Sequence, residues 1–179
     1  MKTLSNLSDI LNVIQTAELG DDVNMQYKAL LLSALSEEFG AWYFYIISKP
    51  YIIGEHFKDI KNLFEETAKD ELEDHAYWLM ERLNQLGYSV EELAHPSSWA
   101  NFAEHKYVKP IFDTNGNIDP KTVLEQAIQS ELDAIATYTN LYEFTNAIKD
   151  STSNLKIRQI LADEEEHLSE LRDIYDSIK

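Results

Sequence analysis

The chain has 179 residues, enough for a single domain, residues 1–179, with a substantial core. Aspartate and glutamate number 32 against 15 lysines and arginines, so the formal net charge is -17. This charge disfavours nucleic acid and anionic membranes as direct partners and suits a protein that attracts cations. The sequence has no cysteine, which excludes disulfides and thiolate metal sites. Because we find no long apolar run and no signal-peptide pattern, we expect a cytoplasmic protein.

The first part of the chain predicts a short helix followed by a long one. Apolar residues at three- and four-residue spacing indicate an amphipathic helix at about residues 5–18. The next helix should run from about Asp22 to Ser48, with Pro50 just beyond its end. Glu38 interrupts its apolar stripe. Glu37 lies on a neighbouring stripe, and the pattern leaves open which of the two faces the core.

The second long helix should run from about Glu55 to Leu86 and stop at Gly87. His75 lies on its apolar stripe, and Glu71 and Leu72 compete for the position one turn earlier. A charged group on a core face needs compensation, because burying it unpaired costs several kcal/mol.

Residues 88–119 contain two of the four prolines and an Asn115-Gly116 turn, but also several aromatic side chains. This composition predicts an ordered crossover rather than a flexible linker. His95 and His105 lie in this segment, and we expect them to be loop residues outside any site.

The third long helix should begin at Asp119-Pro120, an N-cap residue followed by proline at the first helical position. Glu131 interrupts its apolar stripe. The fourth helix carries Glu164 and His167 on its core face. A carboxylate and a histidine three residues apart project from one turn of a helix, so a metal ion is their natural partner.

The lengths of the connections indicate how the four helices pack. Short links make antiparallel pairs of the first and second helices and of the third and fourth helices. The long link then carries the chain across the bundle. We therefore predict an all-α fold, a four-helix bundle over about residues 22–178 with a long crossover between helices two and three, preceded by the short N-terminal helix.

The two helix pairs carry a weak repeat. The spacing from Glu38 to Glu71 is 33 residues, and so is the spacing from Glu131 to Glu164. A tyrosine follows the first glutamate of each pair by seven residues. Two such pairs facing each other would bring together four carboxylates and two imidazoles, which offset two divalent ions and suit iron or manganese.

These features resemble the ferritin-like superfamily, near bacterioferritin and the Dps-like ferritins. The resemblance rests on four segments in order around the crossover: Glu38-Phe39-Gly40-Ala41 through Tyr45, His75-Ala76, Glu131-Leu132-Asp133-Ala134 and Asp163-Glu164-Glu165-Glu166-His167. One position departs from the family pattern. The family's glutamate three residues before the second-helix histidine is here Leu72, and Glu71 precedes that histidine by four residues. A one-residue π-bulge would absorb the extra residue and turn Glu71 toward the site.

The resemblance implies a ferroxidase that oxidises Fe(II) with O2 or H2O2 and stores the Fe(III) mineral. It implies two iron ions per subunit, with manganese as an alternative metal, and these ligands: Glu38, Glu71, His75, Glu131, Glu164 and His167. Tyr45 would supply an electron or orient the oxidant. We expect no haem, because Leu72 and Glu73 stand where the family has its haem-ligating methionine. The family's fifth helix is missing, which favours a homo-oligomer of twelve subunits over one of twenty-four.

Two alternatives share parts of this pattern. A non-storage di-iron or di-manganese peroxidase or oxidase, similar to rubrerythrin, would use the same ligands without a shell. A metal-free structural bundle would need basic partners for its buried acids, yet the core stripes contain almost no lysine or arginine.

Overall fold

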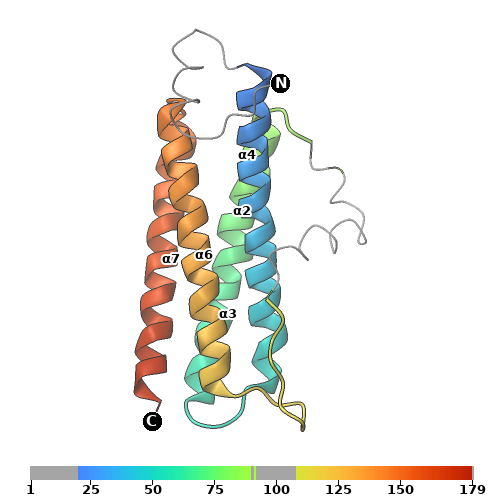
Figure 1. Cartoon of the computed structure of the whole chain (residues 1–179), viewed down its shortest axis with the longest axis vertical. Coiled ribbons are helices and arrows are strands. Elements are labelled where there is room, and N and C mark those ends of the chain that lie inside the picture. Colours follow the sequence, from blue (N-terminus) through green and yellow to red (C-terminus); the bar gives the residue numbers. More distant parts are fainter. Residues whose placement is uncertain (1–19, 90, 92–107, 179) are drawn as a thin grey trace.

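The computed structural model describes residues 20–89, 91 and 108–178, which form an all-α bundle of four long helices (Figure 1). The first, third and fourth long helices are α2 (Asp21–Ser48), α6 (Pro120–Ala147) and α7 (Ser151–Ser177). The second consists of three consecutive parts: α3 (Phe57–Asp70), the π-helical turn η2 (Glu71–Ala76) and α4 (Tyr77–Gln85). The predicted N-terminal helix at residues 5–18 lies outside the described residues, as do His95 and His105.

The helix ends follow the local sequence. Asp119 caps α6 by accepting a hydrogen bond of 2.9 Å from the backbone N–H of Thr122, and Pro120 occupies the first turn. Asp150 caps α7 by accepting one of 3.1 Å from the backbone N–H of Ser153. Gly87 follows the end of the second long helix with φ +78°, the left-handed conformation that glycine adopts without strain.

The connections are those of the predicted bundle. The short link between α2 and α3 makes these helices antiparallel, as the turn before α7 does for α6 and α7 (Figure 1). The crossover starts beyond α4 at one end of the bundle and reaches α6 at the other. There the backbone N–H of Ile118 donates to the carbonyl of Tyr51 over 2.9 Å, which ties the two connections together. Within the described residues, no helix combines the length and apolarity that crossing a bilayer requires.

Two apolar clusters fill the bundle, one on each side of a buried polar layer. On α7, Ile160 belongs to the first cluster and Leu171 to the second, and Glu164 and His167 lie between them. The same order holds on α2. Because apolar side chains close the polar layer at both ends, charges inside it interact in a medium of low dielectric constant.

A second polar network joins α2, α4 and α7 at the end where α6 turns into α7. The Arg82 guanidinium donates to Asp150 Oδ2 and to Ser153 Oγ, each over 2.6 Å. The Tyr27 hydroxyl lies 2.8 Å from the same Asp150 oxygen. Burial opposes the charge of Asp150, but Arg82 and the α7 backbone outweigh it and lower the pKa of this carboxyl to about 2. The network therefore fixes the end of the bundle that lies opposite the Ile118 contact.

Candidate metal centre

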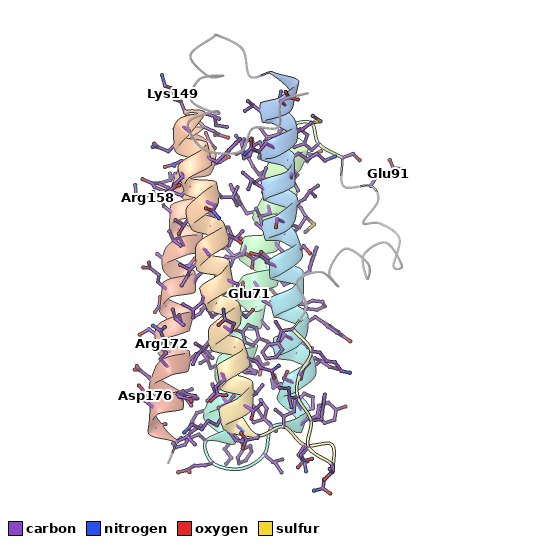
Figure 2. All side chains as sticks on the ribbon, in the orientation of Figure 1. Glu71, Glu91, Lys149, Arg158, Arg172 and Asp176 are labelled. Carbon is purple, nitrogen blue, oxygen red and sulfur yellow. The ribbon has the colours of Figure 1, made fainter. Side chains whose placement is uncertain are left out.

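The six residues that the sequence suggests as ligands meet in one buried layer. They come from α2, η2, α6 and α7, and none is more than 5 % exposed: Glu38, Glu71, His75, Glu131, Glu164 and His167. Figure 2 shows Glu71 about midway along the bundle. Four carboxylates and two imidazoles in one apolar interior require mutual compensation.

The structure decides between the two adjacent glutamates of α2. Glu38 is buried in the layer, and its Oε1 accepts a hydrogen bond from the Tyr138 hydroxyl. Glu37 is half-buried and lines a cavity of about 260 Å³ beside the layer, between α2 and α6. Glu38 is therefore the α2 residue that belongs to the cluster.

The predicted π-bulge in the second helix is confirmed as the turn η2. It allows Glu71 and His75, four residues apart, to face the interior together, with 3.0 Å between Glu71 Oε2 and His75 Nδ1. Glu73 and Asp74 are exposed, and Leu72 packs against the first apolar cluster. The extra residue is absorbed in η2 without turning Glu71 away from the site.

The buried ligand-type atoms fall into two overlapping groups. In each group, one atom from each residue lies within 4.8 Å of all the others: Glu38, Glu71, His75 and Glu164 in one, and Glu71, Glu131, Glu164 and His167 in the other. Glu71 and Glu164 belong to both. Each of these two carboxylates has two oxygens, so each can provide a ligand atom to both groups at once.

The two histidines present the same atom to the carboxylates. His75 Nδ1 lies 3.2 Å from Glu164 Oε1 and 3.5 Å from Glu38 Oε2. His167 Nδ1 lies 3.5 Å from Glu164 Oε2, 3.7 Å from Glu71 Oε1 and 3.9 Å from Glu131 Oε2. The two rings are 6.1 Å apart between centroids. Both halves of the centre therefore have the same arrangement.

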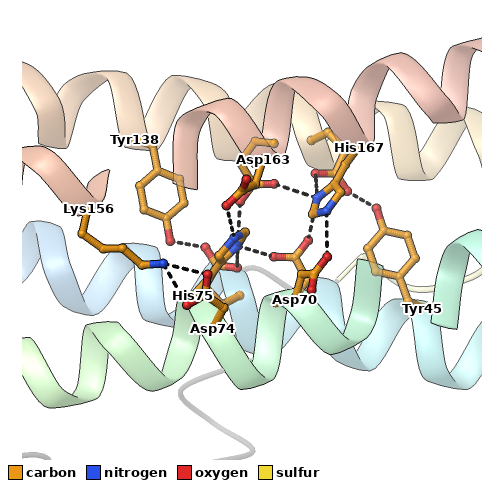
Figure 3. Close-up of polar contacts among 12 residues, drawn as sticks. Tyr45, Asp70, Asp74, His75, Tyr138, Lys156, Asp163 and His167 are labelled. Carbon is orange, nitrogen blue, oxygen red and sulfur yellow. Dashed lines mark hydrogen bonds and ion pairs between the residues drawn. The ribbon is translucent and has the colours of Figure 1, made fainter. Parts of the chain in front are cut away.

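Two buried tyrosines link helices α2 and α6 across the centre. The Tyr45 hydroxyl of α2 donates to Glu131 of α6, and the Tyr138 hydroxyl of α6 donates to Glu38 of α2 (Figure 3). Both side chains are fully buried. Each tyrosine thus orients a carboxylate that belongs to only one of the two groups.

Two further carboxylates, for which the sequence predicted no role, contact the outer faces of the histidines. Asp163 Oδ2 lies 3.5 Å from His75 Nε2, and Asp70 Oδ2 lies 3.5 Å from His167 Nε2 (Figure 3). Each aspartate directly precedes a shared glutamate, and this repeated Asp-Glu pair is the signal that could have revealed them. Each carboxylate thus lies close enough to attract an N–H at Nε2, on the side of the ring opposite the Nδ1 atom that faces the centre.

Charge compensation within the cluster comes from the histidines. Burial raises the pKa values of Glu71 and Glu131, and the charge of Glu164 raises them further. Burial also works against the charge of Glu164, but its close contacts with the imidazoles of His167 and His75 outweigh it and lower the pKa of Glu164 to about 2. For both histidines, burial lowers the pKa, but the carboxylates, Glu164 first, raise it more. Without a metal ion, the cluster therefore favours positive charge on the histidines and disfavours negative charge on Glu71 and Glu131.

These residues fit a pair of metal ions. Both carboxylate oxygens of Glu164 and the Nδ1 atom of His167 are buried, and they find no hydrogen-bond partner of regular geometry among the described residues. Buried polar atoms rarely stay unpaired, because this costs about 1–3 kcal/mol each. The mixed oxygen and nitrogen donors suit iron or manganese. Metal ions would replace the cationic protons of the cluster.

Comparison with known proteins agrees with this reading of the fold. The model of the Ferritin-like domain family matches residues 28–179. A dodecameric thioferritin, the bacterioferritin-related protein from Bacteroides fragilis, is 31 % identical, with a TM-score of 0.72 over 93 % of this chain and 91 % of that one. A ferritin-like diiron-carboxylate protein from Bacillus anthracis is 21 % identical, with a TM-score of 0.69 over 87 % of this chain and 99 % of that one. Dps from Thermosynechococcus elongatus is 18 % identical, with a TM-score of 0.73 over 85 % of this chain and 91 % of that one.

The chain therefore belongs to the ferritin-like family. Within this family it is similar to a bacterioferritin-related protein, and its fold is that of Dps proteins. A search of curated proteins found no match. The family and the buried carboxylate–histidine cluster together fit iron oxidation or iron storage.

Proposed function

We propose that the protein is a ferroxidase that oxidises Fe(II) with O2 or H2O2 and sequesters the Fe(III) in an oligomeric shell. The observation that carries this proposal is the pair of four-residue groups that share Glu71 and Glu164. Two Fe(II) ions held by shared carboxylates would supply two electrons together, and each ion would become Fe(III). With two protons, two electrons reduce O2 to H2O2, or H2O2 to two molecules of water.

Each residue has a defined part in this proposal. Glu71 and Glu164 would contribute to both iron positions, and one further glutamate and one histidine would complete each position. Glu71 and Glu131 release their protons as Fe(II) binds, because the incoming positive charge lowers their raised pKa values. Asp163 and Asp70 hold the histidine rings in place.

For storage, we propose a homo-oligomer of twelve subunits. The support is the 31 % identity to a protein described as dodecameric. Apolar side chains stay exposed at the end of the bundle near the α2–α3 link, where Tyr51 and Phe112 pack against each other with 5.3 Å between ring centroids. Such a surface suits contact with another subunit. A cytoplasmic location and the absence of haem stay predictions from the sequence.

The test is aerobic addition of Fe(II) to the metal-free protein, followed by absorbance, light scattering, gel filtration and metal analysis on the same sample. We expect fast oxidation of two Fe(II) per subunit, then slower uptake of further iron within a particle of twelve subunits. A monomer or dimer that stops after two ions would instead indicate the non-storage oxidase. A protein that binds no iron would be a structural bundle.

We further propose that Tyr45 supplies an electron or orients the oxidant, with Tyr138 as the matched control. Tyr138→Phe removes an equivalent hydrogen bond to a carboxylate, so it should slow oxidation about tenfold. Tyr45→Phe should slow it more, by about 100-fold, while both variants still bind two Mn(II). Stopped-flow absorbance measures the rates. Equal rates in the two variants would reduce the role of Tyr45 to positioning Glu131.

A further inference from the structure

The outer face of His75 belongs to a third group of metal-type side chains. Asp74, His75 and Asp163 each offer one ligand atom, and these atoms lie within 4.8 Å of one another. His75 is fully buried, and its Nε2 atom, which points toward Asp163, has no hydrogen-bond partner of regular geometry in the described part of the chain. Two carboxylates beside a buried imidazole form a place that favours a cation.

A lysine provides that cation. Lys156 Nζ lies 2.8 Å from one oxygen of Asp74 and 2.7 Å from the other (Figure 3). Lys156 precedes Asp163 by seven residues, which is about two turns of α7, so the two side chains leave the same face of the helix. The ammonium group therefore pairs with Asp74, two turns of α7 before Asp163.

The other half of the bundle lacks this lysine. Glu164 follows Glu71 by 93 residues, and Asp163 follows Asp70 by the same number. At this spacing, the residue that corresponds to Lys156 in the first half is Leu63. Around Leu63 the groove between α3 and α7 opens into a cavity of about 230 Å³, whose charged lining is acidic apart from His167: Glu66, Asp70, Asp163, Glu166 and Glu170. The two otherwise matching histidines thus have different surroundings on their outer faces. Among the described residues, no three ligand-type atoms lie within 4.8 Å of one another at the outer face of His167, so we expect no ion there.

We propose that Lys156 is a built-in cation that pairs with Asp74 and excludes a third divalent ion from the outer face of His75. An ammonium group within contact distance of Asp74 repels an incoming divalent ion and neutralises one of the two carboxylates that would bind it. Asp163 then stays available to the N–H at His75 Nε2. The inference rests on the proposed function for the two inner ions, and its own site shares only His75 with theirs.

The effect of Lys156 is tested by removing its charge and counting metal ions. Mn(II) is titrated calorimetrically into the full-length protein and its variants, and crystals soaked in Mn(II) give anomalous difference maps. We expect two ions per subunit in the parent and in Lys156→Arg, which keeps the charge. Lys156→Leu introduces the residue type that the other half has at this position, Leu63. This variant should bind three ions, with an additional peak between Asp74 and Asp163. Adding Asp74→Asn to this variant should return the number to two.

The outcomes separate this proposal from the function on which it rests. If Lys156→Leu and Lys156→Gln both bind two ions, with no peak at Asp74, the role of Lys156 is overturned while the two inner sites stand. If the parent binds none and Lys156→Leu binds one at Asp74, the proposed function fails but the role of Lys156 is supported. If neither protein binds Mn(II), both are overturned.

Discussion

Replacing Glu164 with alanine is expected to abolish both metal positions, whereas Glu131→Ala should abolish only one. Glu164 belongs to both four-residue groups, and its oxygens lie 3.2 Å from His75 Nδ1 and 3.5 Å from His167 Nδ1. Glu131 belongs to one group only. Calorimetric titration with Mn(II) should therefore give two ions per subunit in the parent, none in Glu164→Ala and one in Glu131→Ala. Iron oxidation in Glu164→Ala should fall by about 100-fold or more.

The exposed neighbour Glu165 provides the matched control for this prediction. Glu165→Ala removes the same charge from the same turn of α7, but its side chain faces solvent, so two ions should still bind. Circular dichroism should show similar helicity in all these variants, because alanine is a good helix former. Two ions in Glu164→Ala would mean that the metal centre lies elsewhere.

Deleting Leu72 is expected to convert η2 into regular α-helix and to leave both metal positions intact. From Ile60 to Leu83 the buried positions advance 23 residues in six turns, about 3.8 residues per turn instead of 3.6. One residue fewer brings the spacing to about 3.7. Glu71 would then precede its histidine by three residues, as Glu164 precedes His167. The flanking parts of the helix should keep their core faces.

The measurements are Mn(II) stoichiometry and the free energy of unfolding by urea. We expect two ions, and a stability no lower than that of the parent. Deletion of the exposed Glu81 in regular α4 is the control, because it turns Leu83 by about 100° out of the core. This deletion should cost about 2–5 kcal/mol, the usual loss for a buried leucine. If deleting Leu72 is as damaging as deleting Glu81, η2 does not absorb an extra residue.

Periodicity along single helices determined most of the fold and most of the candidate site. Glu131, Glu164 and His167 stand on apolar stripes, so their burial follows from the spacing of their own neighbours. The lengths of the links determined which helices are antiparallel. The sequence also predicted η2, because one extra residue between Glu71 and His75 has to be absorbed if both side chains are to face the core.

Only the tertiary structure decided which of two neighbouring residues enters the site and which side chains on different helices contact each other. Glu37 and Glu38 lie on adjacent stripes, and only the rotation of α2 against α6 shows that Glu38 enters the layer. The contacts of Asp163 with His75 and of Lys156 with Asp74 join α7 to η2. A helical pattern specifies which face of a helix is apolar. The rotation and axial register between two helices determine which side chains contact each other. Both depend on how all the side chains pack together.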